Sequence, residues 1–151
     1  MINGRAETNL GATVIRLIAI ALISLGFGAA AQAQETNILA GVFTEAQAAR
    51  GEEVYQAICA VCHGEDLNTV DDESPSLTGF TFNFSWNGKT LAEKFEIVRD
   101  TMPSGNPVVV NEQSKIDIIA YILGFNGFPA GDQELGLDLA ILGQITVVPA
   151  P

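Results

Sequence analysis

The sequence is poor in the residues that build most metal centres and nucleic-acid interfaces. It holds one histidine, two cysteines and seven lysine and arginine residues among 151 residues. One histidine and two cysteines exclude a multi-histidine zinc site and a framework of several disulfides. The seven basic residues stand against 18 acidic ones, a formal net charge of −11, so nucleic acid is excluded as a partner. We expect instead partner proteins that carry basic patches.

Residues 1–33 have the pattern of an export signal. Arg5 and Arg16 flank a polar start, and residues 17–27 form an uncharged apolar segment too short to span a membrane comfortably. Ala31-Gln32-Ala33 has the small-x-small form that a signal peptidase cuts. We therefore expect a signal peptide at 1–33, a periplasmic protein and no stable membrane span after cleavage. An uncleaved anchor is the alternative.

The remaining chain predicts a lead-in at 34–43, one helical domain at 44–127 and an extension at 128–151. Capping residues mark three helix starts: Thr44 with Gln47 reaching back, Thr90 with Glu93, and Asn111. The third helix has a buried face, formed by Ile116, Ile119, Ala120 and Leu123. Residues 101–107 must be a loop because they hold two prolines and a glycine.

Aromatic residues alternate between Phe80 and Trp86. Phe80, Phe82, Phe84 and Trp86 occupy every second position, so the sequence predicts an extended segment with all four rings on one side. Such rings could form ordinary core or pack against a flat cofactor.

Cys59-Ala60-Val61-Cys62-His63 is the most informative motif. Two thiols three positions apart near a helix end project to roughly the same side, where they can bind two vinyl groups of a porphyrin while His63 binds the iron. A thiol–disulfide pair is the alternative, but it needs a helix that begins at the motif, and here a helix leads into it. The sequence therefore predicts one covalent haem c.

The second axial ligand can be argued by elimination. After the leader is removed, Met102 is the only methionine and no second histidine remains. Lys89, Lys94 and Lys115 would have to be desolvated and deprotonated to bind iron, whereas a neutral thioether suits ferrous iron. Met102 as a core residue, and so a five-coordinate haem, is the alternative.

Two further residues are predicted near the haem. The Pro75 carbonyl, a dozen residues beyond His63, could accept the second N–H of the imidazole. The Trp86 indole N–H could donate to a haem propionate.

An acidic loop follows the motif, with Glu65, Asp66, Asp71, Asp72 and Glu73. A solvated loop is the simplest interpretation, and electrostatic steering toward a basic partner is the functional one. The pattern lacks the regular ligand spacing of an EF-hand calcium loop.

Taken together, these motifs resemble a class I c-type cytochrome over residues 43–131. The similar features are Arg50-Gly51, the Cys59–Gly64 motif, Pro75-Ser76-Leu77, Trp86, Met102-Pro103 and Ala120-Tyr121. The resemblance implies an all-α fold of three to four short helices around one haem, with the first and last helices crossing. It implies His63 and Met102 as iron ligands and an electron carrier of a respiratory chain rather than an enzyme.

Two longer strings, at 43–51 and 121–131, are similar to cytochrome subunits or domains that accept electrons from periplasmic quinoprotein (PQQ) dehydrogenases. This resemblance implies a dehydrogenase as electron donor, or a dehydrogenase complex with the chain as a subunit, and an oxidase or another cytochrome as acceptor. A five-coordinate haem sensor or peroxidase and a thiol–disulfide oxidoreductase are the alternative functions. The extension past Gly131 could dock on a partner or cover the domain's own core.

Overall fold

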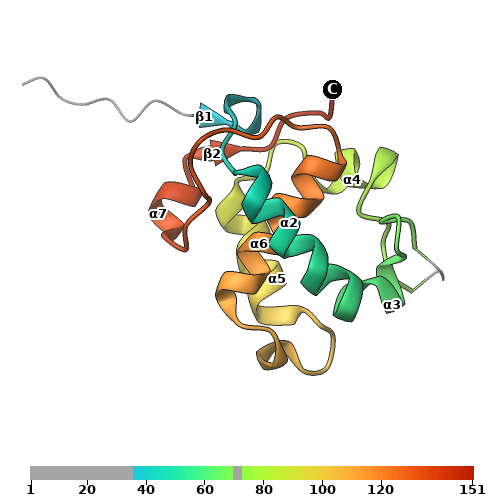
Figure 1. The fold of residues 1–151 in the computed structure, drawn as a ribbon. Helices are drawn as coiled ribbons and strands as arrows, with labels where there is room; N and C mark the ends of the chain where they lie inside the picture. Colours follow the sequence, from blue (N-terminus) through green and yellow to red (C-terminus); the bar gives the residue numbers. More distant parts are fainter. Residues whose placement is uncertain (1–35, 70–72) are drawn as a thin grey trace, which may run out of the picture. The chain divides into compact units, whose positions relative to one another are not determined.

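Residues 36–69 and 73–151 are described by a computed structural model and form a mainly helical fold. The predicted leader, Asp71 and Asp72 lie outside the described residues. In chain order the elements are β1 (Thr36–Asn37), a 3-10 turn (Ile38–Ala40), α2 (Glu45–Val54), a π-helical segment (Tyr55–Cys59), α3 (Ala60–His63), α4 (Gly79–Trp86), α5 (Leu91–Thr101), a second 3-10 turn (Pro107–Val109), α6 (Glu112–Phe125), α7 (Leu139–Leu142) and β2 (Ile145–Thr146) (Figure 1). The all-α prediction is confirmed, because the two strands hold two residues each.

The three predicted helix starts are confirmed. The Thr44 hydroxyl accepts the Gln47 N–H at 3.1 Å, and the Asn111 side chain accepts the Ser114 N–H at 2.8 Å. Thr90 and Glu93 form the complete capping box at the start of α5. These contacts satisfy backbone donors that a helix leaves free at its first turn.

The Gln47 side chain differs from the prediction because it does not reach back to the cap. It is fully buried, and its amide nitrogen donates to the Leu135 carbonyl at 2.9 Å and to Asp117 Oδ1 at 3.0 Å. Its amide oxygen accepts the Leu135 N–H at 2.8 Å. A buried amide that satisfies both backbone groups of Leu135 ties the C-terminal extension to α2.

Helices α2 and α6 cross at Gly51, where the two backbones come into contact (Figure 1). A Cβ atom on Gly51 would lie 1.9 Å from the Asp117 carbonyl oxygen, so only glycine allows this approach. The predicted buried face of α6 is confirmed: Ile116, Ile119, Ala120 and Leu123 are each 0% exposed.

The prediction for the aromatic segment is wrong. Residues 79–86 form helix α4 rather than an extended segment. Residues four apart share one helix face, so the rings form two pairs: Phe82 and Trp86 are buried, whereas Phe80 and Phe84 are exposed. The alternate spacing of the four aromatic residues therefore arises from two i, i+4 pairs, one on the buried face of α4 and one on its exposed face.

The C-terminal extension covers the core of the described domain. Its apolar side chains Leu135, Leu142, Ile145 and Val147 are buried with those of the helices. Strand β2 pairs in parallel with β1, and the Val147 N–H donates to the Lys89 carbonyl at 2.8 Å. The extension thus joins the lead-in to the start of α5.

Candidate haem-binding site

The predicted attachment motif lies where a π-helical segment meets a short α-helix. Cys59 ends the π-helical segment, and Cys62 and His63 lie in α3, which ends at Gly64 with φ of 79°. Inserted π-turns are rare and occur often at functional sites. Both cysteines are free; Cys59 is partly buried and Cys62 is exposed.

Tyr55 fixes the end of this motif. Its fully buried hydroxyl donates to the Gly64 carbonyl at 2.7 Å, and its ring lies 5.2 Å from the Tyr121 ring on α6. The Gln56 amide donates to the Glu65 carbonyl at 2.9 Å. The sequence contains no signal for these contacts, because two of them join the segment before the motif to the loop after it and the third joins that segment to α6.

His63 has one ring nitrogen already engaged. Its Nδ1 lies 2.9 Å from the Pro75 carbonyl oxygen, the contact that the sequence predicts. A carbonyl can only accept, so Nδ1 carries the proton and Nε2 keeps its lone pair. The imidazole is therefore in the tautomer that an iron ligand requires.

The Pro75 segment is itself held on two sides. The Leu77 N–H donates to the Leu67 carbonyl at 2.8 Å, and the Asn126 amide donates to the Leu77 carbonyl at 2.9 Å. Asn126 thus connects the end of α6 to the segment that orients His63. Its role was not visible in the sequence, since 49 residues separate Asn126 from Leu77.

Met102 directly follows the last residue of α5 and lies in the predicted loop. It is half-buried, and its N–H donates to the Val98 carbonyl at 3.2 Å. The loop continues to the 3-10 turn at Pro107–Val109. The loop predicted at 101–107 is confirmed for residues 102–106, whereas Thr101 still belongs to α5 and Pro107 to the 3-10 turn.

The three lysines that could compete with Met102 are all engaged elsewhere. Lys89 pairs with Glu93 at 3.4 Å. Lys94 donates to the Ser85 carbonyl, and Lys115 donates to the carbonyls of Arg99 and Pro107 at 2.5 and 2.7 Å. Burial lowers the pKa of Lys94 and Lys115, yet each ammonium keeps a carbonyl partner.

Trp86 lies inside the core. It is 5% exposed, stacks on Phe82 with ring centroids 5.0 Å apart, and has Lys94 Nζ 5.3 Å from its ring centroid. Its bond to a haem propionate stays a prediction.

Exposed apolar side chains test whether these residues fit a haem. Among the large hydrophobic residues that the structure describes, four are the most exposed: Val108, Phe80, Phe84 and Val61, at 86%, 84%, 81% and 77%. Val61 lies between the two cysteines, and Phe80 and Phe84 lie on the helix that begins four residues after Pro75. Val108 lies in the 3-10 turn that follows the loop of Met102. The segments with the predicted ligands thus expose apolar surface that a planar apolar group would cover. With two free thiols and an imidazole lone pair, they fit a covalent haem.

The Cys59 thiol has unfavourable properties for disulfide exchange. Burial, and then the neighbouring Cys62, raise the pKa of Cys59 to about 11. An exchange enzyme needs a thiolate at neutral pH, usually from a lowered pKa. The structure therefore does not support the thiol–disulfide alternative.

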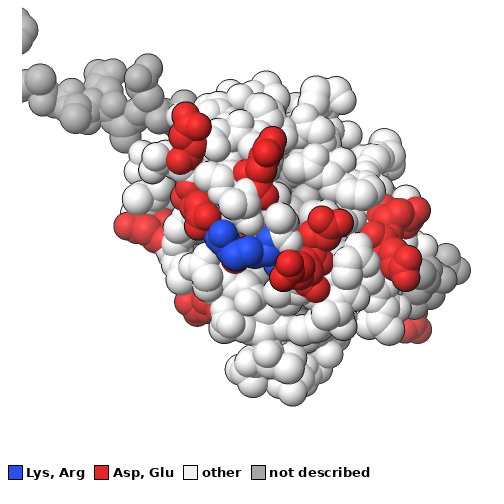
Figure 2. Space-filling view, in the orientation of Figure 1, with Lys and Arg blue, Asp and Glu red and all other residues white. Residues whose placement is uncertain are grey.

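Most of the charged side chains visible on the face on which α2 lies are acidic, and basic ones occupy a small area (Figure 2). Arg50 is neutralised by Asp117 at 3.1 Å and Glu134 at 2.9 Å. These two carboxylates raise the pKa of Arg50.

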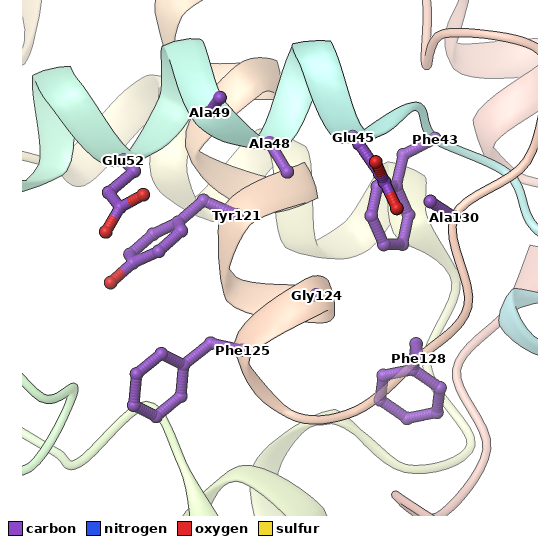
Figure 3. Close-up of a pocket in the computed structure, with 10 residues that line it drawn as sticks. All are labelled: Phe43, Glu45, Ala48, Ala49, Glu52, Tyr121, Gly124, Phe125, Phe128 and Ala130. Atoms are coloured by element: carbon purple, nitrogen blue, oxygen red, sulfur yellow. The ribbon is translucent and has the colours of Figure 1, made fainter.

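A cavity of about 370 Å³ lies between α2 and α6. Figure 3 shows Glu45 and Glu52 beside the rings of Phe43 and Tyr121, with Phe125 and Phe128 farther along. None of the six predicted haem residues lines this cavity.

Residues 36–69 and 73–151 lack two features. They contain no helix that is long and apolar enough to cross a bilayer. They also contain no group of three or more His, Cys, Asp and Glu side chains that could hold a metal ion.

The helical fold, the free thiols beside an oriented imidazole and the uncovered apolar surface define a haem-binding protein of the c type. The sequence profile of a family described as "Cytochrome C oxidase, cbb3-type, subunit III" matches residues 46–122, just over half of the chain. The chain belongs to this family, and it is a class I c-type cytochrome whose cofactor is one covalently attached haem c.

The similarity to a curated relative supports the same family. "Cytochrome c-551" of Bacillus subtilis (strain 168) is 36% identical over 77 residues, which cover 48% of this chain and 62% of the relative. The chain thus covers less than two thirds of that relative's length.

Proposed function

We propose that the protein is a one-electron carrier whose haem is bound by Cys59 and Cys62 and ligated by His63 and Met102. The contact of His63 Nδ1 with the Pro75 carbonyl carries this proposal, because it leaves Nε2 free to bind iron on α3, which holds Cys62 and directly follows Cys59. When bound, the haem supplies an iron that alternates between ferric and ferrous states.

Each residue of the site has a defined task in this function. The two cysteine sulfurs tether the porphyrin, and the Pro75 carbonyl holds the His63 ring in one orientation. Met102 supplies a neutral thioether, which stabilises the ferrous state and raises the reduction potential. With His63 and Met102 both bound to it, the iron would have no open position for a substrate, and little rearrangement would accompany electron transfer.

Spectra of wild type and Met102→Ala test the ligand assignment. We expect the ferric wild type to show a weak long-wavelength band from sulfur-to-iron charge transfer, which Met102→Ala loses. The reduced variant should bind carbon monoxide rapidly, whereas the wild type should not. A wild type that lacks the band and binds carbon monoxide as the variant does would show a five-coordinate sensor or peroxidase. A colourless protein with two titratable thiols would show the thiol–disulfide alternative.

We also propose where the carrier works. Its leader, with Ala31-Gln32-Ala33 before Gln34, favours export to the periplasm. N-terminal sequencing of the exported protein should give Gln34, and an intact Met1 would contradict cleavage.

The electron donor that we propose is a periplasmic quinoprotein (PQQ) dehydrogenase with a basic docking patch, and the acceptor is a terminal oxidase or another cytochrome. The similarity of residues 43–51 and 121–131 to the cytochromes of such dehydrogenases supports the donor, and the net charge of −11 supports the basic patch. A purified PQQ dehydrogenase should reduce the protein faster than an equally active flavin dehydrogenase does. Equal rates would contradict this donor class.

A further inference from the structure

A buried lysine on α6 contacts the loop that holds Met102. Lys115 is 3% exposed, and its Nζ donates to the Arg99 carbonyl at 2.5 Å and to the Pro107 carbonyl at 2.7 Å. Burial of an ammonium group is unfavourable unless it is hydrogen-bonded or paired. Among the described residues Lys115 forms no ion pair, so these two carbonyls are its compensation.

Along the sequence, one of the two carbonyls comes before Met102 and the other comes after it. Arg99 is in the last turn of α5, and Pro107 begins the 3-10 turn after the loop. Within the loop the Asn106 N–H donates to the Pro103 carbonyl at 3.1 Å. One side chain thus joins the two ends of the loop to each other and to the central helix α6.

A thioether is a neutral ligand, so it stays at the iron only if the chain holds it there. A free loop would lose conformational entropy each time the ligand binds, whereas a loop already held closed loses little. Hydrogen bonds from a charged donor are stronger than those between neutral groups, so an ammonium group is well suited to hold a loop closed.

We propose that Lys115 is the positioning residue for Met102: its ammonium group clamps both ends of the loop and so keeps the thioether bound to iron. This inference rests on the proposed function, in which Met102 is the second axial ligand.

Lys94 provides a matched control in the same chain. It is also a buried lysine, 9% exposed, and its Nζ also donates to a backbone carbonyl, that of Ser85. Its contacts join α5 to α4 and do not involve residues 100–107. Replacing either lysine removes one buried ammonium, but only Lys115 holds the loop.

Imidazole binding to the ferric holoprotein measures how often Met102 leaves the iron, since added imidazole takes the vacated position. Its apparent affinity scales with the fraction of molecules in which Met102 is released. We expect Lys115→Leu to bind imidazole about tenfold tighter than the wild type and to show a weaker sulfur-to-iron band. Lys94→Leu should stay within about twofold of the wild type. If Lys115→Leu yields no holoprotein, Lys115→Gln, whose amide is too short to reach both carbonyls, should show the same tighter binding.

Two results would overturn the proposal. Lys115 variants that bind imidazole like the wild type would show that the clamp does not act on Met102, and an equal rise in Lys94→Leu would show a general loss of stability. Met102→Ala, measured in parallel, separates these from a failure of the ligand assignment. If the wild type already binds imidazole as tightly as Met102→Ala, Met102 is not a ligand, and both proposals fail together.

Discussion

Tyr55 illustrates how a single buried hydroxyl fixes the haem-attachment segment. Its hydrogen bond to the Gly64 carbonyl closes the chain around Cys59, Cys62 and His63. The candidate haem-binding residues themselves can be proposed from the sequence, because Cys59-x-x-Cys62-His63 is a local pattern with defined chemistry. The Tyr55 contact cannot be, since nothing in the sequence indicates which carbonyl a buried hydroxyl will reach.

We predict that Tyr55→Phe lowers the free energy of unfolding by about 1–3 kcal/mol, because the buried Gly64 carbonyl loses its partner. Denaturant unfolding of the holoprotein measures this. Tyr121→Phe is the control, because the hydrogen bond that the Tyr121 hydroxyl accepts from the Gln56 side-chain nitrogen is long, at 3.5 Å. Equal stability of Tyr55→Phe and wild type would contradict the account.

At the scale of elements, the α2–α6 crossing determines where the attachment segment lies, because the π-helical segment and α3 continue directly from α2. Gly51 was predictable as a point of close approach, and the capping residues predicted the helix starts. The face that each aromatic of α4 presents was not predictable. Alternate spacing fits both a strand with one ring face and a helix with two, and only tertiary packing decides between them.

We predict that Gly51→Ala destabilises the protein by about 1–3 kcal/mol or more, because the added methyl group would overlap the Asp117 carbonyl and force the helices apart. Gly124→Ala on the same pair of helices is the control. Its Cβ would lie 3.5 Å from the Phe43 ring, an ordinary contact, so its stability should stay close to that of the wild type. Thermal unfolding of both variants measures the difference, and similar effects would contradict the close approach.

The capping box of α5 predicts a dependence of stability on pH. The Thr90 N–H donates to the Glu93 carboxylate and, with Lys89 nearby, lowers the pKa of Glu93 in the folded state. A lowered folded pKa stabilises the protein above the unfolded pKa, and this contribution is lost as pH falls through the folded value.

Glu93→Gln keeps an acceptor oxygen but does not titrate. We therefore expect the variant to lose less stability than the wild type between about pH 5 and pH 3. Urea unfolding at several pH values measures the slopes, and parallel slopes would contradict the prediction.

At the scale of the whole molecule, the net charge of −11 affects the rate at which the protein encounters charged redox partners, both small reagents and proteins. The composition alone predicted this property. The role of the extension needed the structure, because Leu135 and Leu142 could equally have docked on a partner. They are buried with the helices, and Gln47 holds the Leu135 backbone.

Two small redox reagents of opposite charge test the steering. We expect reduction by hexaammineruthenium(II), a cation, to slow as ionic strength rises from about 0.01 M to about 0.15 M, because salt screens the attraction. Reduction by ferrocyanide, an anion, should accelerate over the same range. Stopped-flow absorbance gives both rates. The same trend for both reagents would show that the protein's charge does not steer the encounter.

The most direct test of the central claim, a haem bound covalently through Cys59 and Cys62, is mass spectrometry of the exported protein under denaturing conditions, followed by proteolysis. The account predicts a mass equal to the polypeptide plus one haem, with the whole addition on the peptide that contains Cys59 and Cys62. A mass equal to the amino acids alone, or a haem that separates from the chain on denaturation, would contradict it.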